Sequence, residues 1–519
     1  MAGTVSVGRC GALLTAPWGR AAAAVLAGAL PALAFPAPAL WWLAYVALVP
    51  WLLLLRSSPT GYRAALDGWL GGAGLLLAVH HWLLPSLHVF ILVLAALLGV
   101  LWAPWGLLVH RLLGGDPGPG RVLVALLAVP SGWLMVELVR SWEYLGGPWG
   151  LFGASQWQVT PALRLASVGG IWLVSFLLVA LNTGLSALFR APRARIAGAA
   201  GVLGCVAVTA GVWWGAPEPE AAGTLRVAVV QPGPYEGDEG GRHRFDVEER
   251  LTRGLAGRGV ALVVWGESSV DHDLSRRPDL RGRLAALSRT VGADVLVNVD
   301  ARRADRPGIF KSSVLVGPDG PTGDRYDKMR LVPFGEYVPA RSVLGWATSV
   351  GKAAREDRRR GDRQVVMRLP DGARIGPLVC FESAFPDMSR HLAREGAQLL
   401  VAQSSTSTFQ RSWAPRQHAS LVALRAAETW RPMVHATLTG VSAVADARGR
   451  RIGAWLDTDR PTVAVYEVLL ARGTSPYVRY GDWVPWGALA VLVCCGAATA
   501  VRRWLRRRTA AAGQRTGTA

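Results

Sequence analysis

The chain has 519 residues, of which 51% are hydrophobic and 23 are tryptophan. This is too apolar for an ordinary soluble protein. Because the apolar residues lie in blocks, the composition predicts membrane spans joined to one globular domain. The formal net charge of +20 comes from arginines between and after these blocks, which membrane topology explains, so we set aside a nucleic-acid partner. The sequence contains no Cys-x-x-Cys pair and no His/Cys cluster of metal-binding spacing, so we expect neither a metal nor another cofactor.

Eight apolar blocks predict a polytopic α-helical membrane part, with seven spans before the globular domain and one after it. Several blocks, the first two among them, are shorter than the roughly 20 residues that a spanning helix needs. The blocks cover residues 21–35, 39–55, 64–84, 87–110, 122–139, 162–189, 196–215 and 483–501.

The arginines test this number of spans, because positive charge marks the cytoplasmic side of a membrane. With seven spans before the globular domain, five arginine clusters fall on one side. Both termini are then cytoplasmic and the globular domain lies outside. The clusters are Arg9 and Arg20, Arg56 and Arg63, Arg111 and Arg121, Arg190 to Arg195, and Arg502 to Arg508.

One loop predicted on the outer side, 133–156, carries charges close to the membrane. Glu137 and Arg140 are three residues apart, so on a helix they share a face and can pair. Charges in this position are costly unless they are paired or functional. A structural ion pair inside a tryptophan-rich belt is the simplest interpretation.

The globular part alternates strand-like and helix-like segments, which predicts an α/β layered domain. We expect a membrane domain at 1–219, a globular domain at 220–472, and a final span with a basic tail at 473–519. The predicted strands are 225–231, 260–265, 294–299, 312–316, 375–380, 398–402 and 434–436, and the clearest helices are 276–290 and 415–430.

Only one of the five cysteines lies in this globular part. Three others sit in apolar runs and Cys10 lies in the N-terminal leader, whereas Cys380 ends an apolar strand with Glu382 two residues later. A lone buried cysteine is usually a small core residue. Thiol chemistry at Cys380 therefore requires other reactive groups nearby.

Two further segments supply such groups. Glu267 follows an apolar strand beside Trp265, and Lys328, one of only three lysines, lies in a Pro/Gly-rich loop with Glu336. A carboxylate can take the proton of a thiol, and an ammonium group lowers the thiol pKa and stabilises an oxyanion. Surface ion pairs for Glu267 and Lys328, and core packing for Cys380, are the structural alternatives.

Together these motifs resemble the carbon–nitrogen hydrolase (nitrilase) superfamily, in which Glu, Lys and Cys occur in this chain order. With the membrane spans, the whole chain is similar to the bacterial apolipoprotein N-acyltransferases. The matching positions include Glu137, Arg140, Gly169, Ser175, Asn182, Trp265, Glu267, Tyr326, Lys328, 331–337, Cys380, Glu382, Gln417, His418, Arg425, Glu428, Tyr477 and Asp482.

The resemblance implies an αββα sandwich docked on eight spans of the bacterial cytoplasmic membrane, with the sandwich on the outer face. It implies Glu267 as general base, Lys328 as oxyanion stabiliser and Cys380 as nucleophile. Supporting or substrate-binding roles are implied for Glu336, Glu382, Trp265, Phe381 and Tyr337. The implied reaction moves an acyl chain from a phospholipid to a thioester on Cys380, then to the N-terminal amine of a diacylglyceryl-modified apolipoprotein.

The chain departs from the family pattern around the triad but not within it. A membrane-anchored amidase that uses water as acyl acceptor, and a divergent copy acting as a non-catalytic scaffold, therefore stay open as alternative functions. The departures are Gly266, Phe381, Gln403–Phe409, His435, Leu438 and 232–234.

Overall fold

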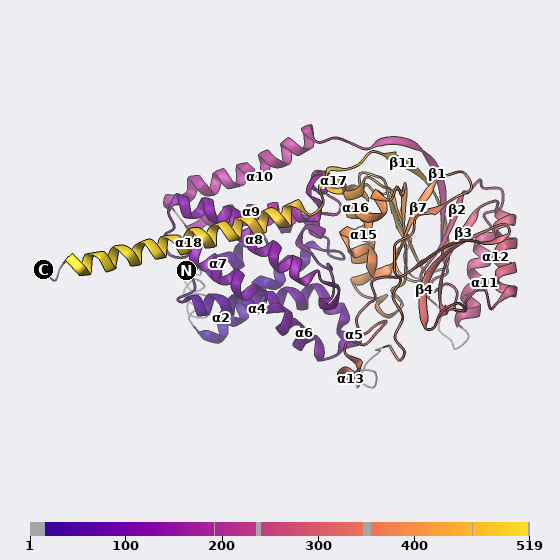
Figure 1. Cartoon of the computed structure of the whole chain (residues 1–519), viewed down its shortest axis with the longest axis horizontal. Helices are drawn as coiled ribbons and strands as arrows, with labels where there is room; N and C mark the ends of the chain where they lie inside the picture. The colour runs from indigo at the N-terminus through magenta and orange to yellow at the C-terminus, as the bar shows by residue number, and fades with distance from the viewer. Residues whose placement is uncertain (1–15, 191, 235–239, 346–353, 459, 517–519) are drawn as a thin grey trace, which may run out of the picture.

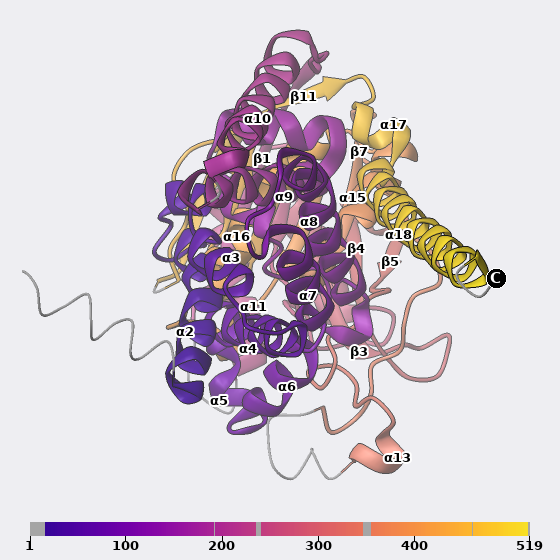
Figure 2. The same cartoon turned by 90° about the vertical axis from the view of Figure 1, so that its left-hand side faces the viewer.

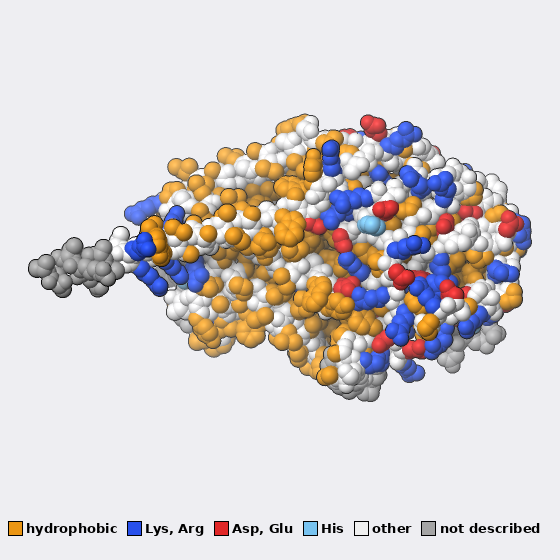
Figure 3. Space-filling view, viewed as in Figure 1, with side chains coloured by type: hydrophobic (Ala, Val, Ile, Leu, Met, Phe, Trp, Pro, Cys, Tyr) orange, Lys and Arg blue, Asp and Glu red, His pale blue; other side chains and the backbone are white. Residues whose placement is uncertain are grey.

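The computed structural model describes residues 16–190, 192–234, 240–345, 354–458 and 460–516. Within them, a bundle of helices and a two-sheet domain lie end to end, and the last helix returns from the sheets along the bundle (Figure 1). Hydrophobic side chains dominate the visible surface of the helical part, whereas charged side chains gather on the sheet part (Figure 3). Arg9 and Cys10 of the leader lie outside the described residues.

Apolar helices form the membrane part, as the sequence predicts. They are α2 (Pro17–Ala29), α3 (Val49–Arg56), α4 (Gly61–His80), α5 (Leu84–Leu87), α6 (Phe90–Gly99), α7 (Trp102–Leu113), α8 (Pro119–Arg140), α9 (Thr160–Arg190), α10 (Arg195–Gly215) and α18 (Trp483–Thr516). In the described residues, five helices are long and apolar enough to cross a membrane, or six if α6 and α7, bent by 42°, form one span. The first two predicted blocks form shorter helices, so the number eight stays a prediction.

Arginines from different segments form hydrogen bonds with neighbouring helices at one end of the bundle. Asp67 accepts hydrogen bonds from Arg20 at 2.7 Å and from Arg63 at 2.9 Å. Arg56 donates to the carbonyl oxygen of Ser186, near the end of α9, at 3.1 Å. The segments before α2, between α3 and α4, and after α9 therefore lie on the same side.

Two more loops join this end. Arg193, after α9, lies 3.4 Å from Asp116, which follows α7. The exposed arginines 502–508 lie on the part of α18 that extends beyond the bundle (Figure 1). At the other end, Arg164 contacts Glu218 at 2.5 Å, just before the first strand. Seen from the arginine end, α18 runs along the outside of the bundle (Figure 2), where it packs on α8 and α9.

The globular part is an αββα sandwich, as predicted. One sheet has the order β11-β1-β2-β3-β4-β5 and the other β10-β9-β8-β7-β6. The strands are β1 (Glu220–Gln231), β2 (Leu262–Trp265), β3 (Asp294–Arg302), β4 (Ile309–Gly317), β5 (Gly320–Asp327), β6 (Met367–Arg368), β7 (Arg374–Val379), β8 (Leu399–Ser404), β9 (Met433–Thr437), β10 (Ala443–Ala445) and β11 (Thr462–Arg472). The helices are α11 (Gly240–Arg253), α12 (Pro278–Val291), α13 (Arg341–Leu344), α15 (Pro386–Arg394), α16 (Ala414–Thr429) and α17 (Pro476–Tyr480).

Every predicted strand and helix of this domain is present, but the four strands at the sheet edges were not predicted. β5, β6, β10 and β11 each pair on one side only. β6 and β10 have only two and three residues, too few for a periodic pattern, and β5 (Gly320–Asp327) is mostly polar, so the apolar periodicity that marks a strand is missing from these three.

Three apolar cores stack through the molecule. The first lies between the two sheets and contains Val264, Val379 and Val434. The second lies between the six-stranded sheet and helices α11 and α12. The third joins α15 and α16 to the membrane helices. Because α16 packs on β9 on one side and on α9 on the other, the five-stranded sheet and the membrane part share one helix layer.

The predicted ion pair between Glu137 and Arg140 is wrong. Both side chains are buried, but in this described part of the chain no ion pair joins them, and each binds the following loop instead. Glu137 accepts from the indole of Trp133 at 2.9 Å and from the N–H of Phe152 at 2.7 Å. Arg140 donates to the carbonyl oxygen of Trp149 at 2.7 Å. The two charges therefore fix the loop against α8.

Candidate active site

Cys380 sits at a sharp turn between β7 and a short 3-10 helix, Cys380–Ala384. Its φ of +52° lies in the left-handed region that non-glycine residues rarely adopt. Such strain persists only where the surroundings hold it. Here the carbonyl oxygen of Cys380 accepts from Ser383 Oγ at 2.9 Å and lies 3.1 Å from His418 Nε2. The turn places the thiol at the carboxyl end of the parallel strands β7, β8 and β9.

Glu382 clamps this turn to the loop that begins with Lys328. One carboxylate oxygen accepts from the N–H of Val379 at 2.8 Å, and the other accepts from the Tyr326 hydroxyl and from the N–H groups of residues 329–330 at 2.7–3.1 Å. Glu382 is fully buried. It therefore fixes the position of Cys380 relative to Lys328, which is a supporting position of the kind that the resemblance implied.

Four charged side chains meet beside the thiol, and we call them the charge quartet: Glu267, Glu336, Lys311 and Lys328. Oε1 of Glu267 lies 2.8 Å from Lys311 Nζ and 3.2 Å from Lys328 Nζ. Oε1 of Glu336 lies 2.8 Å from Lys328 Nζ and 3.2 Å from Lys311 Nζ. The Lys328 side chain has no exposed surface, so these contacts act with little screening by water.

Burial and the charge quartet together set the protonation states. Burial alone would raise the pKa of Glu267, but the ammonium groups of Lys311 and Lys328 outweigh it and lower this pKa to about 2, with a further contribution from a hydrogen bond to Cys380. Burial raises the pKa of the Cys380 thiol to about 12. The nearby carboxylates of Glu267 and Glu336 overcome burial and raise the pKa of Lys328 well above its usual value. At rest the sulfur therefore holds its proton beside an ionised carboxylate and a charged ammonium.

The three aromatic residues predicted to support the site have different surroundings. Trp265 points away, because side chains alternate along β2: Val264 faces the other sheet, whereas the indole of Trp265 faces α11 and donates to Thr252 at 2.9 Å. The ring of Phe381 packs edge-on against Phe385 at 4.9 Å. Tyr337 is partly buried near Arg360, whose guanidinium lies 5.6 Å from its ring.

The membrane part reaches this region through aromatic side chains. Oε1 of Gln417, on α16, accepts from the indoles of Trp149 at 2.9 Å and Trp82 at 3.2 Å. The neighbouring His418 packs its ring 5.3 Å from that of Trp149. A Cβ added at Gly147 would lie 2.6 Å from the Phe381 ring. The loop that follows α8 is therefore in contact with the Cys380 turn.

One departure from the family pattern, Gly266, has a steric reason. A Cβ at Gly266 would lie 1.9 Å from the backbone nitrogen of Leu438, so this backbone allows only glycine there. The backbone carbonyl oxygen of Ser404 accepts from the N–H groups of both Leu438 and Glu267, at 2.9 and 3.1 Å. The close approach at Gly266 therefore fixes the position of the adjacent Glu267 backbone relative to the five-stranded sheet.

Two other departures are buried and polar. Nε2 of Gln403 donates to the carbonyl oxygens of Trp265 and Leu296 at 2.9 and 3.2 Å, joining the two sheets. His435 lies edge-on to His418 at 4.6 Å, and among the described residues neither of its ring nitrogens has a hydrogen-bond partner. Burial lowers the pKa of His435 well below its usual value, so the ring is neutral.

Lys311 and His418 are the functional neighbours of the triad that the sequence did not assign to the site. The rarity of lysine was a usable signal for Lys311, because both described lysines, 311 and 328, belong to the charge quartet. His418 matches a family position but has no distinctive local motif. Its proximity to Cys380 depends on the packing of α16 against β9 and the 3-10 helix Cys380–Ala384.

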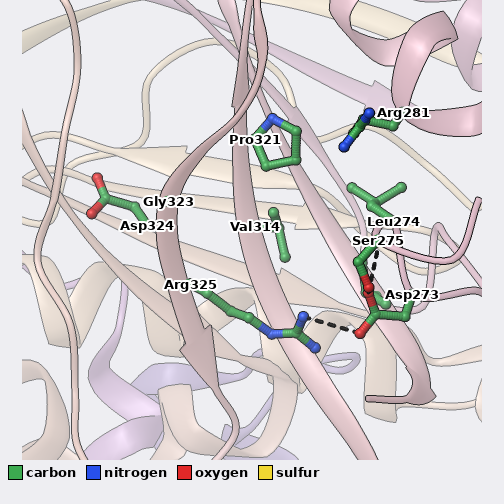
Figure 4. Close-up of a pocket in the computed structure, with 10 residues that line it drawn as sticks. Asp273, Leu274, Ser275, Arg281, Val314, Pro321, Gly323, Asp324 and Arg325 are labelled. Carbon is green, nitrogen blue, oxygen red and sulfur yellow. Dashed lines mark hydrogen bonds and ion pairs between the residues drawn. The ribbon is translucent and has the colours of Figure 1, made fainter. Parts of the chain in front are cut away.

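A separate pocket of about 310 Å³ lies over β4 and β5, away from the triad (Figure 4). Its charged groups bind one another: Arg325 contacts Asp273 at 3.4 Å, and Asp273 accepts from the Ser275 hydroxyl at 2.7 Å. Its lining residues include no member of the triad or of the charge quartet.

Comparison with known proteins agrees with this architecture in both parts of the chain. Residues 27–184 match the family described as apolipoprotein N-acyltransferase N-terminal domain, and residues 226–475 match carbon-nitrogen hydrolase. A curated apolipoprotein N-acyltransferase of Geobacter metallireducens is 31% identical over 513 residues, covering 94% of this chain and 95% of the relative. The chain belongs to the apolipoprotein N-acyltransferase family. It is therefore an acyltransferase built on a carbon–nitrogen hydrolase domain.

Other apolipoprotein N-acyltransferases match over a similar length. That of Azotobacter vinelandii is 32% identical, covering 91% of this chain and 93% of the relative. That of Pseudomonas aeruginosa is 31% identical, covering 91% and 94%. Among solved structures, an amidase from Nesterenkonia sp. covers 49% of this chain and 92% of its own, with 19% identity and a TM-score of 0.34.

Proposed function

We propose that this acyltransferase moves a fatty acyl chain from a phospholipid to the N-terminal α-amine of a diacylglyceryl-modified apolipoprotein, through a thioester on Cys380. The observation that carries this proposal is the placement of the strained Cys380 turn against the charge quartet. A thiol, a carboxylate that can accept its proton and an ammonium that can stabilise an oxyanion are the groups that acyl transfer needs.

In the first half-reaction, Glu267 takes the thiol proton and the sulfur of Cys380 attacks the ester carbonyl carbon of the phospholipid. Lys328 stabilises the negative charge on the carbonyl oxygen of the tetrahedral intermediate. When the C–O bond breaks, the leaving alkoxide takes the proton from Glu267 and departs as lysophospholipid. The acyl chain stays on Cys380 as a thioester.

In the second half-reaction, the acceptor amine attacks the thioester carbonyl and Glu267 accepts a proton from the amine. The C–S bond breaks, the thiolate leaves beside Lys328 and takes the proton from Glu267, and the product is an amide. A thiolate is a good leaving group for an amine nucleophile, so this step is chemically easier than direct attack on an ester. Glu336 keeps Lys328 in place through both halves.

The proposed location follows from the helices and the arginines. Eight spans, counting the short α2 and the segment Trp41–Arg56, put the arginine end of the bundle in the cytoplasm and the sandwich on the outer face of the bacterial cytoplasmic membrane. Both substrates carry lipid chains, so the aromatic contacts between the outer loop and the Cys380 turn support entry of lipid from the membrane side.

The proposal is tested with the full-length enzyme in detergent–phospholipid micelles. Mass spectrometry should detect an acyl adduct on Cys380 after addition of phospholipid alone, and the adduct should disappear when a diacylglyceryl-modified peptide is added. Cys380→Ala should form no adduct. Release of free fatty acid with no peptide acylation would favour the hydrolase alternative, and absence of any adduct in the unaltered enzyme would favour a scaffold.

Glu267→Gln separates the role of the base from that of binding. The amide keeps the shape but accepts no proton, so adduct formation should slow by about 100-fold or more, while phospholipid binding to the variant persists. Loss of phospholipid binding with an unchanged single-turnover rate would assign Glu267 to binding instead.

A further inference from the structure

Lys311 is the member of the charge quartet that the proposed reaction does not use. The register of β3 and β4 sets it opposite Asp300, and its carbonyl oxygen accepts from the N–H of Lys328 at 2.8 Å. Its ammonium lies 2.8 Å from Glu267, 3.2 Å from Glu336 and 3.7 Å from Asp300. The Lys311 side chain is 13% exposed. Its charge therefore acts on both glutamates at close range and with little screening.

The quartet is electrically balanced, because two carboxylates face two ammonium groups. Without Lys311, the only ammonium group of the quartet facing Glu267 and Glu336 would be that of Lys328. Because one positive charge does not balance two buried carboxylates, the two would share a proton as pH falls. Oε2 of Glu336 also accepts from the N–H of Val332 at 2.8 Å, which favours the ionised form of Glu336. The shared proton would therefore settle on Glu267.

We propose that Lys311 is a positioning residue for acyl transfer: by balancing the charge of Glu336, it keeps Glu267 ionised and free to take the Cys380 proton. This inference rests on the proposed function, in which Glu267 is the base. Asp300 holds Lys311 from its other side and is itself bound by Arg358 through contacts of 3.3 Å. Lys311 is thus fixed between three carboxylates.

The first test measures the single-turnover rate of acyl-adduct formation against pH for Lys311→Met. Its acid limb, the pH below which the rate falls, should move up by about 1 to 3 pH units, the range in which one neighbouring charge moves a carboxyl pKa. Arg302→Met is the matched control. It removes an exposed cation of β3 that pairs with Glu356 at 2.7 Å and should leave the acid limb in place.

A second change restores the balance and separates charge from structure. In Lys311→Met combined with Glu336→Gln, one ammonium again faces one carboxylate, so the acid limb should return toward that of the unaltered enzyme even if the overall rate is lower. Lys311→Arg, which keeps the charge, should shift the limb least. If Lys311→Met does not accumulate in the membrane, Lys311→Gln tests the same loss of charge with a polar side chain.

Infrared spectroscopy detects whether the Glu267 carboxyl is protonated, and it needs no catalytic turnover. It therefore distinguishes failure of this inference from failure of the proposed function. At mildly acidic pH, Lys311→Met should show an additional band of a protonated carboxyl relative to the unaltered enzyme at the same pH, and this added band should vanish when Glu267→Gln is introduced. If the band appears but no adduct forms in any variant, the proposed function fails while Lys311 still governs Glu267. No band, together with an unmoved acid limb or an equal loss of rate at every pH, would overturn the inference.

Discussion

The carboxylate of Glu428, on α16, accepts a hydrogen bond at 2.7 Å from the backbone N–H of Ile171, inside α9. That N–H is available because α9 breaks at Gly169 and Gly170, where the helical dihedral angles are lost. A Cβ at Gly170 would lie 2.6 Å from the Tyr477 ring. The broken span therefore receives a side chain from the catalytic domain, and the two parts of the chain are joined at a point buried in both.

The first prediction is that this joint weakens as pH rises. Burial raises the pKa of Glu428 to about 7, above its unfolded value of about 4.3. The protonated form is therefore favoured in the folded state. Its contribution is complete below the unfolded pKa and is lost as pH rises through about 7, by about 4 kcal/mol in all.

Thermal melting of the detergent-solubilised enzyme against pH checks this. Glu428→Gln still accepts from Ile171 but does not titrate, so its melting temperature should fall less between mildly acidic and mildly alkaline pH than that of the unaltered enzyme. Identical slopes in the two proteins would show that Glu428 keeps an ordinary pKa.

The second prediction concerns Lys328. Lys328→Ala and Lys328→Arg should both lose acyl transfer by several orders of magnitude, as loss of a catalytic group usually does. The arginine variant should fail because a planar guanidinium does not replace a compact ammonium between two carboxylates. Peptide acylation measured at equal membrane expression checks both. Near-normal activity of Lys328→Arg would mean that charge alone suffices.

The third prediction ranks two changes at the clamp under Cys380. Tyr326→Phe removes one donor to Glu382 and should cost about 1.5–3 kcal/mol of stability, the value of a hydrogen bond to a charged group. Glu382→Gln should be worse, because both oxygens of Glu382 face donors and an amide would turn its own N–H groups toward one of them. Denaturation and adduct formation should follow the same order, and the reverse order would remove the clamp role.

The fourth prediction tests the close approach at Gly266. Gly266→Ala should sharply reduce both folding yield and activity, because its Cβ would lie 1.9 Å from the backbone nitrogen of Leu438. Backbone atoms cannot move aside as the end of a flexible side chain can. Gly282→Ala, on exposed α12 with nothing within 4 Å of the added Cβ, is the matched control. It should be neutral or stabilising by up to about 1 kcal/mol. Equal behaviour of the two variants would contradict the packing at Gly266.

The fifth prediction is the membrane topology. Alkaline phosphatase, which is active only outside the cytoplasm, should be active when fused after Pro219 and inactive when fused after Arg508. The physical reason is that positively charged loops stay in the cytoplasm, and Arg20, Arg63 and Arg193 all lie at the end of the bundle away from the sheets. The reverse pattern of activity would place the sandwich in the cytoplasm.

The internal strands and the polar segments that bear Glu267, Lys328 and Cys380 were predictable because each has a signal within a short window. β1, β2 and β8 are apolar runs bounded by turn residues, and the reactive groups stand at the ends or edges of such elements. The edge strands β5, β6 and β10 lack that signal. The sequence likewise does not indicate which group a charged side chain will bind. Glu137 and Arg140 have ideal helical spacing for a pair, yet each bonds a loop that the helix itself cannot specify.

By itself, then, the sequence determined the two-part architecture and the position of the arginines between and after the apolar blocks, since these follow from composition and periodicity, and through its resemblance to the family it nominated Glu267, Lys328 and Cys380 as the triad. The tertiary structure alone decided that Lys311 joins the triad, that Glu382 clamps the Cys380 turn, and that Glu428 fills the break in α9. These relationships join residues 44 to 257 positions apart. They depend on strand register and on how the sandwich packs against the helices, and no local pattern of side chains encodes either one.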